Sequence, residues 1–153
     1  MSKVKRRRRG TAIVETDRGI LLTAGRPGKP FILPGGEAKR DESRFVAALR
    51  ELTEETRLLP YSARVIFRHK GEVNKKYGYQ DYHTVCVVKA TGTPRAGGGD
   101  AKRLGYYSPG CDTWISKTTK EIIERYYDWK KKEALSHDTE IIDEDDEDSD
   151  DVD

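Results

Sequence analysis

Residues 36–58 have the sequence GEAKRDESRFVAALRELTEETRL, and this stretch decides the architecture expected of the whole chain. Apolar side chains recur in it at the spacing of one helix face, at Phe45, Ala48, Leu49 and Leu52. Ser43 is a residue type that caps helix N-termini, and Pro60 lies just beyond the last apolar positions. The pattern predicts a helix from Ser43 to about Leu58.

Three glutamates, Glu51, Glu54 and Glu55, share the opposite face of this helix. They fall within an arc of about 100°, so their mutual repulsion should weaken the helix by a few tenths of a kcal/mol per pair. Arg50 can balance one of these carboxylates, and a hard divalent cation, which takes oxygen ligands, would turn the repulsion into a binding site. A solvated acidic face is the alternative that the glutamates alone leave open.

The spacing around these glutamates resembles the signature of the Nudix hydrolases. Gly36, Glu42 and the RELTEE run that begins at Arg50 stand where that signature has a glycine, a glutamate and Arg-Glu-aliphatic-any-Glu-Glu. A chance match in a chain of this length has a probability on the order of one in 10⁵. The final glycine of the signature is the one position that differs, because Arg57 stands there.

The resemblance implies an α/β fold, the Nudix fold, which is an α/β/α sandwich with a mixed β-sheet. It extends over about residues 11–135, which we expect to form the Nudix hydrolase domain. Residues 1–10 are then a basic N-terminal tail, and residues 136–153 are a disordered acidic C-terminal tail.

The resemblance also implies a function, namely hydrolysis of a pyrophosphate bond in a nucleoside diphosphate linked to another group, with Mg²⁺ or Mn²⁺ as cofactor. Carried onto this sequence, Glu54 and Glu55 are the principal metal ligands, and Glu51 is a ligand or the base that takes a proton from water. Arg50 orients a carboxylate, and Gly36 lets the backbone approach the metal site. A cation held by glutamates suits this chemistry, since anionic side chains stabilise a phosphoryl transition state only through a metal.

Further acids are candidates for the same site. Glu42 lies just before the helix and is either a site residue or a structural one. The family often draws another metal ligand from a distant loop, for which Glu72, Asp100 and Asp112 are possible, and the sequence does not choose among them.

The departure at Arg57 allows two geometries for the end of the helix. Arginine in the left-handed cap conformation that glycine normally adopts costs roughly 1 kcal/mol. Alternatively, the helix continues until Pro60 stops it. The three glutamates lie upstream and need not move in either case.

Short β-branched and aliphatic runs indicate the strands: residues 11–16 and 19–25, joined as a hairpin, then 31–33, 63–70, 81–91 and 104–107. Within 81–91, both sets of alternating residues are suited to covered faces, so the sheet should be packed on both sides. A last helix opens with the capping pattern TTKE at residues 118–121 and runs to about Leu135.

The charges are distributed unevenly along the 153 residues, whose net charge is +2. Residues 1–10 carry six bases and no acid, and residues 140–153 carry ten acids and no base. The 23 bases and 17 acids between them suit an anionic ligand, although a solvated basic surface explains the excess equally well. No apolar run approaches the roughly 18 to 20 residues of a bilayer span, so no membrane partner is expected.

These observations leave several functions open. The expected partner is a nucleotide or other diphosphate-containing small molecule. RNA is possible, either as the substrate of a 5′ pyrophosphohydrolase or as the ligand of a non-catalytic nucleotide- or RNA-binding Nudix domain. Cys86 and Cys111 are too few for a disulfide framework, which favours a cytoplasmic protein. The oligomeric state is not predicted.

Overall fold

The structure is a computed structural model that describes residues 3–98 and 101–136. Within these residues it contains the following strands and helices: β1 (Lys5–Ile13), β2 (Glu15–Thr16), β3 (Gly19–Ala24), β4 (Gly35–Glu37), α1 (Arg44–Thr56), β5 (Leu59–Asn74), β6 (Tyr79–Thr91), β7 (Arg103–Tyr107) and α2 (Lys117–Leu135).

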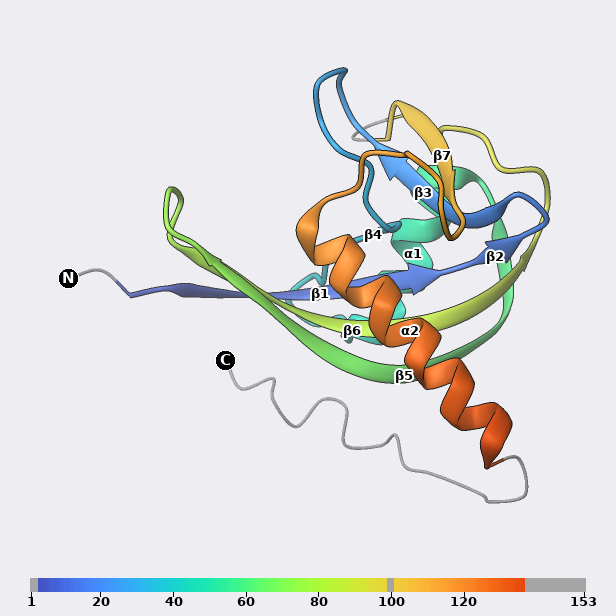
Figure 1. The fold of residues 1–153 in the computed structure, drawn as a ribbon. Coiled ribbons are helices and arrows are strands. Elements are labelled where there is room, and N and C mark those ends of the chain that lie inside the picture. Colours follow the sequence, from blue (N-terminus) through green and yellow to red (C-terminus); the bar gives the residue numbers. More distant parts are fainter. Residues whose placement is uncertain (1–2, 99–100, 137–153) are drawn as a thin grey trace.

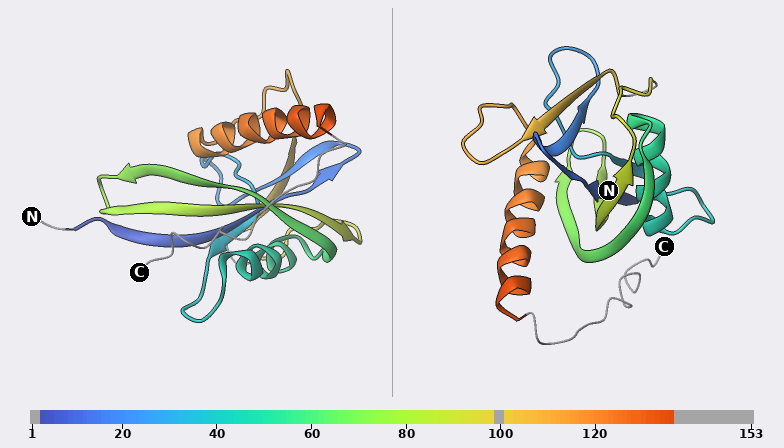
Figure 2. Two further views of the ribbon diagram at one scale, coloured as in Figure 1. Left: turned by 90° about the horizontal axis from the view of Figure 1, so that it is seen from below. Right: turned by 90° about the vertical axis from the view of Figure 1, so that its right-hand side faces the viewer.

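A curved four-stranded sheet with the strand order β4-β1-β6-β5 forms the centre of the fold. β1 pairs with β6 in parallel, whereas the β1–β4 and β5–β6 pairs are antiparallel. The strands β2, β3 and β7 form a second, three-stranded sheet. α1 covers one side of the central sheet and α2 the other (Figures 1 and 2). The expected α/β sandwich with a mixed sheet is therefore confirmed.

Each helix encloses its own apolar core against the sheet. Ala12, Cys86 and Leu52 belong to the core under α1, while Val85 and Ile122 belong to the core under α2. Adjacent residues of β6 thus point into different cores, because side chains of a strand alternate between its faces. This confirms that both faces of the 81–91 segment are covered.

The N-terminal basic run is not a tail. β1 begins at Lys5 and pairs with β6 from Lys5↔Tyr79 onward. The guanidinium of Arg7 lies 3.6 Å from the centre of the Tyr79 ring and forms an ion pair with Asp81. These partners are distant in sequence, and they make a strand out of a segment whose composition alone indicates a solvated tail. The predicted acidic tail at residues 137–153 lies outside the described residues.

Other elements differ from the predicted ones in their bounds. Of residues 31–33, Phe31 and Ile32 form isolated bridges, and the strand that follows them is β4. β5 extends from Leu59 to Asn74 because its hairpin partner β6 continues the pairing beyond the predicted ends. α2 is capped by Ser116, which accepts a hydrogen bond from the Thr119 amide, so its cap lies upstream of the predicted one.

α1 begins as predicted and ends one turn earlier than Leu59. Ser43 caps its N-terminus, and Arg57 adopts the left-handed conformation with φ of 67° at its C-terminus. The first of the two predicted geometries is therefore the one observed. Across the described residues, no helix is both long and apolar enough to cross a membrane.

Candidate active site

α1 directs its three glutamates away from the apolar core. Ala47, Ala48 and Leu52 are fully buried against the sheet. The carboxylates of Glu51, Glu54 and Glu55 line an open cavity of about 570 Å³ between α1 and the loop that contains Gly97 and Gly98. The structure thus brings the three predicted ligand residues to one cavity.

Glu55 is the most buried of these carboxylates. Its Oε1 accepts a hydrogen bond of 3.1 Å from the backbone N–H of Gly35 in β4. Burial raises the pKa of Glu55 to about 8, the neighbouring carboxylate of Glu51 adds to the rise, and the Gly35 hydrogen bond opposes it. The two neighbouring carboxylates repel each other when both are ionised, and a bound cation would offset this repulsion.

Gly36 lies against the Glu51 carboxylate, so its position matches its predicted place beside the site. A Cβ on Gly36 would lie 2.4 Å from the Glu51 carboxyl carbon and from its Oε2. Contacts this short are forbidden, so any larger residue would displace Glu51. Gly36 therefore sets the depth at which that carboxylate sits.

Arg50 holds the acids of this region together. Its Nε and Nη2 donate to the two carboxylate oxygens of Glu42 at 2.7 and 2.9 Å. Its Nη1 donates to Glu51 at 3.2 Å and to Glu54 at 3.1 Å. The bidentate contact lowers the pKa of Glu42 to about 2. Glu42 thus anchors Arg50, which in turn orients two of the predicted ligands.

The donor set suits a hard divalent cation, although the carboxylates are not gathered into one ligand shell. Within the described part of the chain, no three His, Cys, Asp or Glu side chains converge on one point. Glu51 and Glu55 adjoin each other, whereas Glu54 is directed to Arg50 and is 56% exposed. Carboxylate oxygens are the ligands that Mg²⁺ and Mn²⁺ prefer, and a buried acid pair gains most from such a charge. The residues therefore fit the implied metal.

The candidates for an additional ligand do not join this group. Glu72 forms an ion pair with Lys117 of α2. Asp112 is exposed in the loop before α2 and belongs to no metal-binding cluster within the described chain. Asp100 lies outside the described residues.

A second cavity, which the sequence analysis missed, lies between β1, β6 and the start of α2. It has a volume of about 360 Å³, and its lining includes Arg7, Arg9, Asp81 and His83. The charge of Arg9 also opposes the rise in the pKa of Glu55, so the two sites are linked electrostatically. A sequence signal for these residues did exist. The basic run is closely followed by the β-branched residues Thr11 and Ile13, so it could have been interpreted as the start of the same strand.

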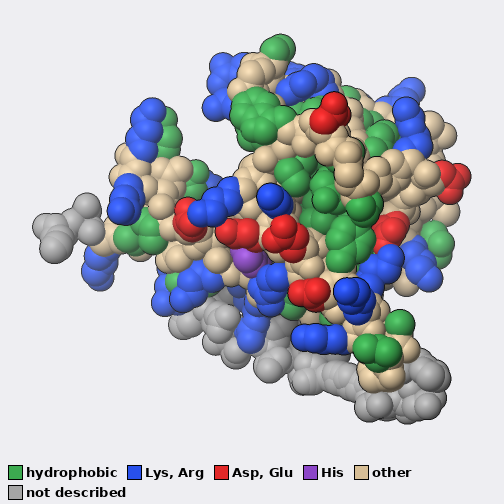
Figure 3. Space-filling model, viewed as in Figure 1, with side chains coloured by type: hydrophobic (Ala, Val, Ile, Leu, Met, Phe, Trp, Pro, Cys, Tyr) green, Lys and Arg blue, Asp and Glu red, His purple; other side chains and the backbone are tan. Residues whose placement is uncertain are grey.

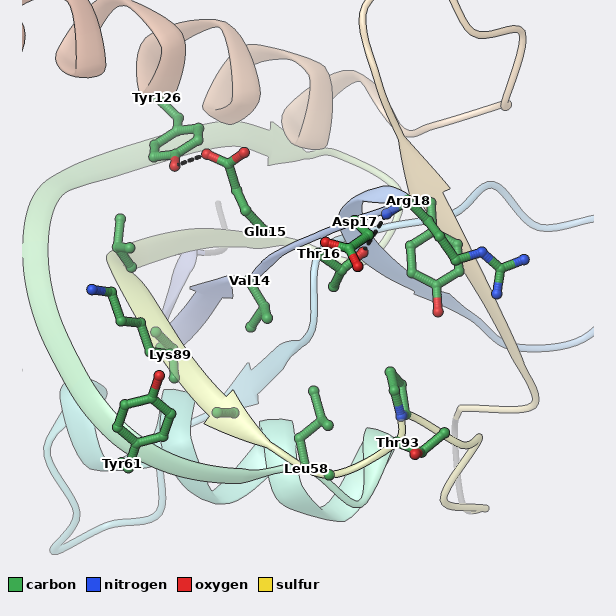
Figure 4. Close-up of a pocket in the computed structure, with 16 residues that line it drawn as sticks. Val14, Glu15, Thr16, Asp17, Arg18, Leu58, Tyr61, Lys89, Thr93 and Tyr126 are labelled. Carbon is green, nitrogen blue, oxygen red and sulfur yellow. Dashed lines mark hydrogen bonds between the residues drawn. The ribbon is translucent and has the colours of Figure 1, made fainter.

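Another cavity, of about 690 Å³, opens at the opposite end of the curved sheet (Figure 4). Tyr61, Leu58 and Val14 line it. One of its acids, the exposed Glu15, accepts hydrogen bonds from Tyr126 and Lys130. Because Glu15 is already held by these two groups and none of the three helix glutamates reaches this cavity, it is not the candidate hydrolytic site.

Comparisons with known proteins agree with this geometry. The family model of the NUDIX domain matches residues 5–109. A crystal structure of a putative Nudix hydrolase family member from Chromobacterium violaceum is 33% identical, with a TM-score of 0.68 over 80% of this chain and 77% of that one. A MutT NUDIX hydrolase from Burkholderia pseudomallei is 21% identical and has a TM-score of 0.68 over 78% of this chain and 97% of that one.

A third similar structure contains a ligand. It is a bifunctional NMN adenylyltransferase/ADP ribose pyrophosphatase from Francisella tularensis, complexed with AMP and a Mn ion. It is 21% identical, with a TM-score of 0.62 over 84% of this chain and 43% of that one. A comparison with curated proteins gives no match. From the matched domain and the 33% identical relative, we conclude that the chain belongs to the Nudix family and is a Nudix hydrolase, an enzyme that cleaves pyrophosphate bonds.

Proposed function

We propose that the protein hydrolyses a pyrophosphate bond in a nucleoside diphosphate linked to another group, with Mg²⁺ or Mn²⁺ held by Glu51, Glu54 and Glu55. The observation that carries this proposal is the partly buried pair of neighbouring carboxylates, Glu51 and Glu55, that lines an open cavity. Such a pair is costly without a counter-ion, and a divalent cation is the counter-ion that this chemistry requires.

When bound, the metal supplies positive charge to the non-bridging oxygens of the reacting diphosphate and lowers the pKa of water. Glu51 and Glu55 would hold it, and Glu54 would join them on giving up its contact with Arg50. Arg50 keeps Glu51 in place through its anchor on Glu42.

The cavity between β1, β6 and the start of α2 is a suitable place for the rest of the substrate. Arg7 and Arg9 supply positive charge there, and Ser116 and Thr119 supply hydroxyls at the start of α2. Its volume of about 360 Å³ is within the range of small-molecule sites. The mixture of cations and hydroxyls favours a phosphorylated, polar ligand over an apolar one.

Substitution of the glutamates tests the proposal. Glu55→Gln and Glu54→Gln should each lower turnover at least about 10²-fold, because each removes an anionic metal ligand. Glu124→Gln, on the exposed side of α2, is the matched control and should keep the wild-type rate. Calorimetric titration with Mn²⁺ should show weakened binding by both site variants. If both variants retain wild-type rates in saturating Mg²⁺, the metal is not at this helix.

The substrate is best identified with a panel. Nucleoside triphosphates, dinucleoside polyphosphates, ADP-ribose and triphosphorylated RNA should be incubated with Mg²⁺ and with a chelator. If one class of compound is hydrolysed with Mg²⁺ but not with the chelator, this supports the proposal and identifies the substrate class.

A second candidate function is removal of pyrophosphate from the 5′ end of RNA. The basic residues of β1 favour it, because positive charge continues beyond the cavity along this strand. In the same panel, RNA as the preferred substrate would select this function. RNA binding that weakens strongly with salt, without any turnover in Mg²⁺, would indicate a non-catalytic binding domain instead.

A further inference from the structure

The arginine run of β1 is divided between the two faces of the sheet. Arg7 and Arg9 contact Asp81 on the side of α2. Arg6 and Arg8 point to the side of α1, as Ala12 does further along the strand. The guanidinium of Arg6 accordingly lies 5.0 Å from the centre of the Tyr82 ring.

Neighbouring elements add further bases on the side of α1. In β5, Arg68 pairs with Thr84 of β6, and Lys70 pairs with Tyr82. Arg44, at the start of α1, lines a cavity of about 320 Å³ together with Arg68 and Lys70. We call the strand bases of this set the basic face; its members are Arg6, Arg8, Arg68 and Lys70, with the buried Arg44 beneath them.

The acids of the same strands point the other way. Within β1, β5 and β6 the only acids are Glu72 and Asp81. Glu72 contacts Lys117, and Asp81 contacts Arg7, both on the side of α2. Figure 3, which shows the side of α2, accordingly has acidic and basic side chains close together. The strands therefore place four bases, and no acid of their own, on the side of α1.

We propose that the basic face binds the acidic segment at residues 140–153 of the same chain, which thereby competes with external polyanions. Charge complementarity is the first argument. This segment has ten acids and no base among fourteen residues, at Glu140, Asp143, Glu144, Asp145, Asp146, Glu147, Asp148, Asp150, Asp151 and Asp153. Its density of negative charge matches a face that has several bases on adjacent strands.

The position at which α2 ends is the second argument. β5 is an edge strand of the sheet, and α2 lies along it, with Glu133 in an ion pair of 3.2 Å with Arg64. The chain beyond Leu135 therefore starts at the edge that separates the two sides of the sheet. Arg64 and Lys70 are about 20 Å apart along the strand, at about 3.3 Å per residue.

The length of the segment is sufficient for this contact. Residues 136–153 can span at most about 60 Å when fully extended, which is about three times that separation. Tethering also gives the acids an effective concentration of about 1 mM at a site within reach. Nucleic acid is the other polyanion that could bind such a face. It is not tethered to the protein, so it gains no comparable effective concentration.

The first experiment uses the full chain and compares it with a neutral variant in which the ten acids are replaced by Asn or Gln. In ¹⁵N-labelled protein at 20 mM NaCl, the amide shifts of Arg6, Arg68 and Lys70 should differ between the two proteins. The differences should vanish at 0.5 M NaCl, where the Debye length is only about 4 Å. The double variant Arg6→Gln, Lys70→Gln should reduce them, whereas Lys29→Gln, an exposed base elsewhere, should not.

The second experiment measures competition with a fluorescent 15-nucleotide oligouridylate. At 20 mM NaCl it should bind the neutral variant at least about 10-fold more tightly than it binds the wild type, because the tethered competitor is lost. The difference should again vanish at 0.5 M NaCl. Identical amide shifts at low salt overturn the proposal, and so does equal affinity for the oligonucleotide. Equal, tight binding by both proteins would assign the basic face to nucleic acid instead.

Discussion

The two sides of the central sheet are held to their helices in different ways. α1 approaches β1 so closely that a Cβ on Gly10 would lie 2.1 Å from the Arg44 carbonyl oxygen. On the other side, α2 is joined to the sheet by polar contacts, such as His69 with Glu121 and the Arg125 guanidinium with the Arg68 carbonyl. Both helices pack on an apolar core, to which α1 adds close backbone contact and α2 adds polar and charged side-chain contacts.

The difference bears on the function of each side. Close packing fixes α1, and with it the three glutamates of the candidate site, at a defined depth above β4. Polar contacts leave room for a cavity between α2 and the sheet, where Arg9 and His83 lie. Stability should accordingly depend on side-chain volume on the side of α1 and on pH and salt on the side of α2.

The largest expected effect comes from adding a methyl group under α1. Gly10→Ala should destabilise the fold by about 3 kcal/mol or more, because its Cβ would collide with backbone atoms that cannot move without the whole helix. Urea unfolding at pH 7 measures the change. The loss should be the same at low and high salt.

Gly71→Ala in β5 is the matched control for this substitution. A Cβ there meets no atom closer than 3.5 Å, so the change in unfolding free energy should remain within about 0.5 kcal/mol. Similar losses for the two variants would show that α1 does not pack on Gly10 as closely as described.

The next effect is the pH dependence of stability that His83, on the side of α2, should cause. Burial lowers the pKa of His83 to about 3, and the charge of Arg9 contributes. The unfolded chain binds a proton at this residue below about pH 6.5 and the folded chain does not, so stability falls as the pH falls. Between pH 6.5 and 4.5 this costs up to about 1.4 kcal/mol per pH unit.

Replacing the imidazole isolates this contribution from those of other groups. His83→Gln retains a hydrogen-bonding group for Thr11 Oγ1, which lies 2.8 Å from the imidazole Nδ1. Unfolding free energy measured from pH 7 to 4.5 should decline less steeply in the variant than in the wild type. Parallel curves would contradict a buried, neutral histidine at this position.

Breaking an ion pair on the same side should have a smaller effect. Asp81→Asn removes the charged partner of Arg7, with which Asp81 forms contacts of 2.7 and 3.3 Å. The expected loss is about 1 to 2 kcal/mol, because the pair is largely screened from solvent. It should shrink at high salt. Glu72→Gln, which breaks the fully exposed pair with Lys117, should cause no measurable loss.

The sequence predicted α1 well because its determinants are local. The Ser43 cap and the spacing of the glutamates lie within a few turns of one another, so neither needs a distant partner. The roles of Glu51, Glu54, Glu55 and Arg50 stay predictions, although the cavity assembles all three glutamates.

The start of β1 could not be predicted in the same way. Its arginines become strand residues through β6, where Tyr79 and Asp81 lie more than 70 positions further along the chain. Composition alone cannot show such a partner. The direction of the Glu54 carboxylate was not predicted either, although its partners are near in sequence, because it depends on how Arg50 is shared with Glu42.

The smallest expected effect is a gain in stability at the end of α1. Arg57 has a φ of 67°, and its N–H donates to the Thr53 carbonyl at 2.9 Å. This left-handed conformation costs arginine about 1 kcal/mol, which glycine does not lose. Arg57→Gly should therefore raise the free energy of unfolding by up to about 1 kcal/mol.

Arg57→Ala separates the backbone from the side chain. It removes the same guanidinium, whose Nη2 lies 3.5 Å from the Gly97 carbonyl oxygen, but it keeps a Cβ in the strained conformation. Chemical denaturation should rank glycine above alanine by about 1 kcal/mol. Equal stability of the two variants would mean that residue 57 is not left-handed in solution. The gain should be independent of salt, in contrast to the loss in Asp81→Asn, because it arises from backbone geometry on the closely packed side of the sheet.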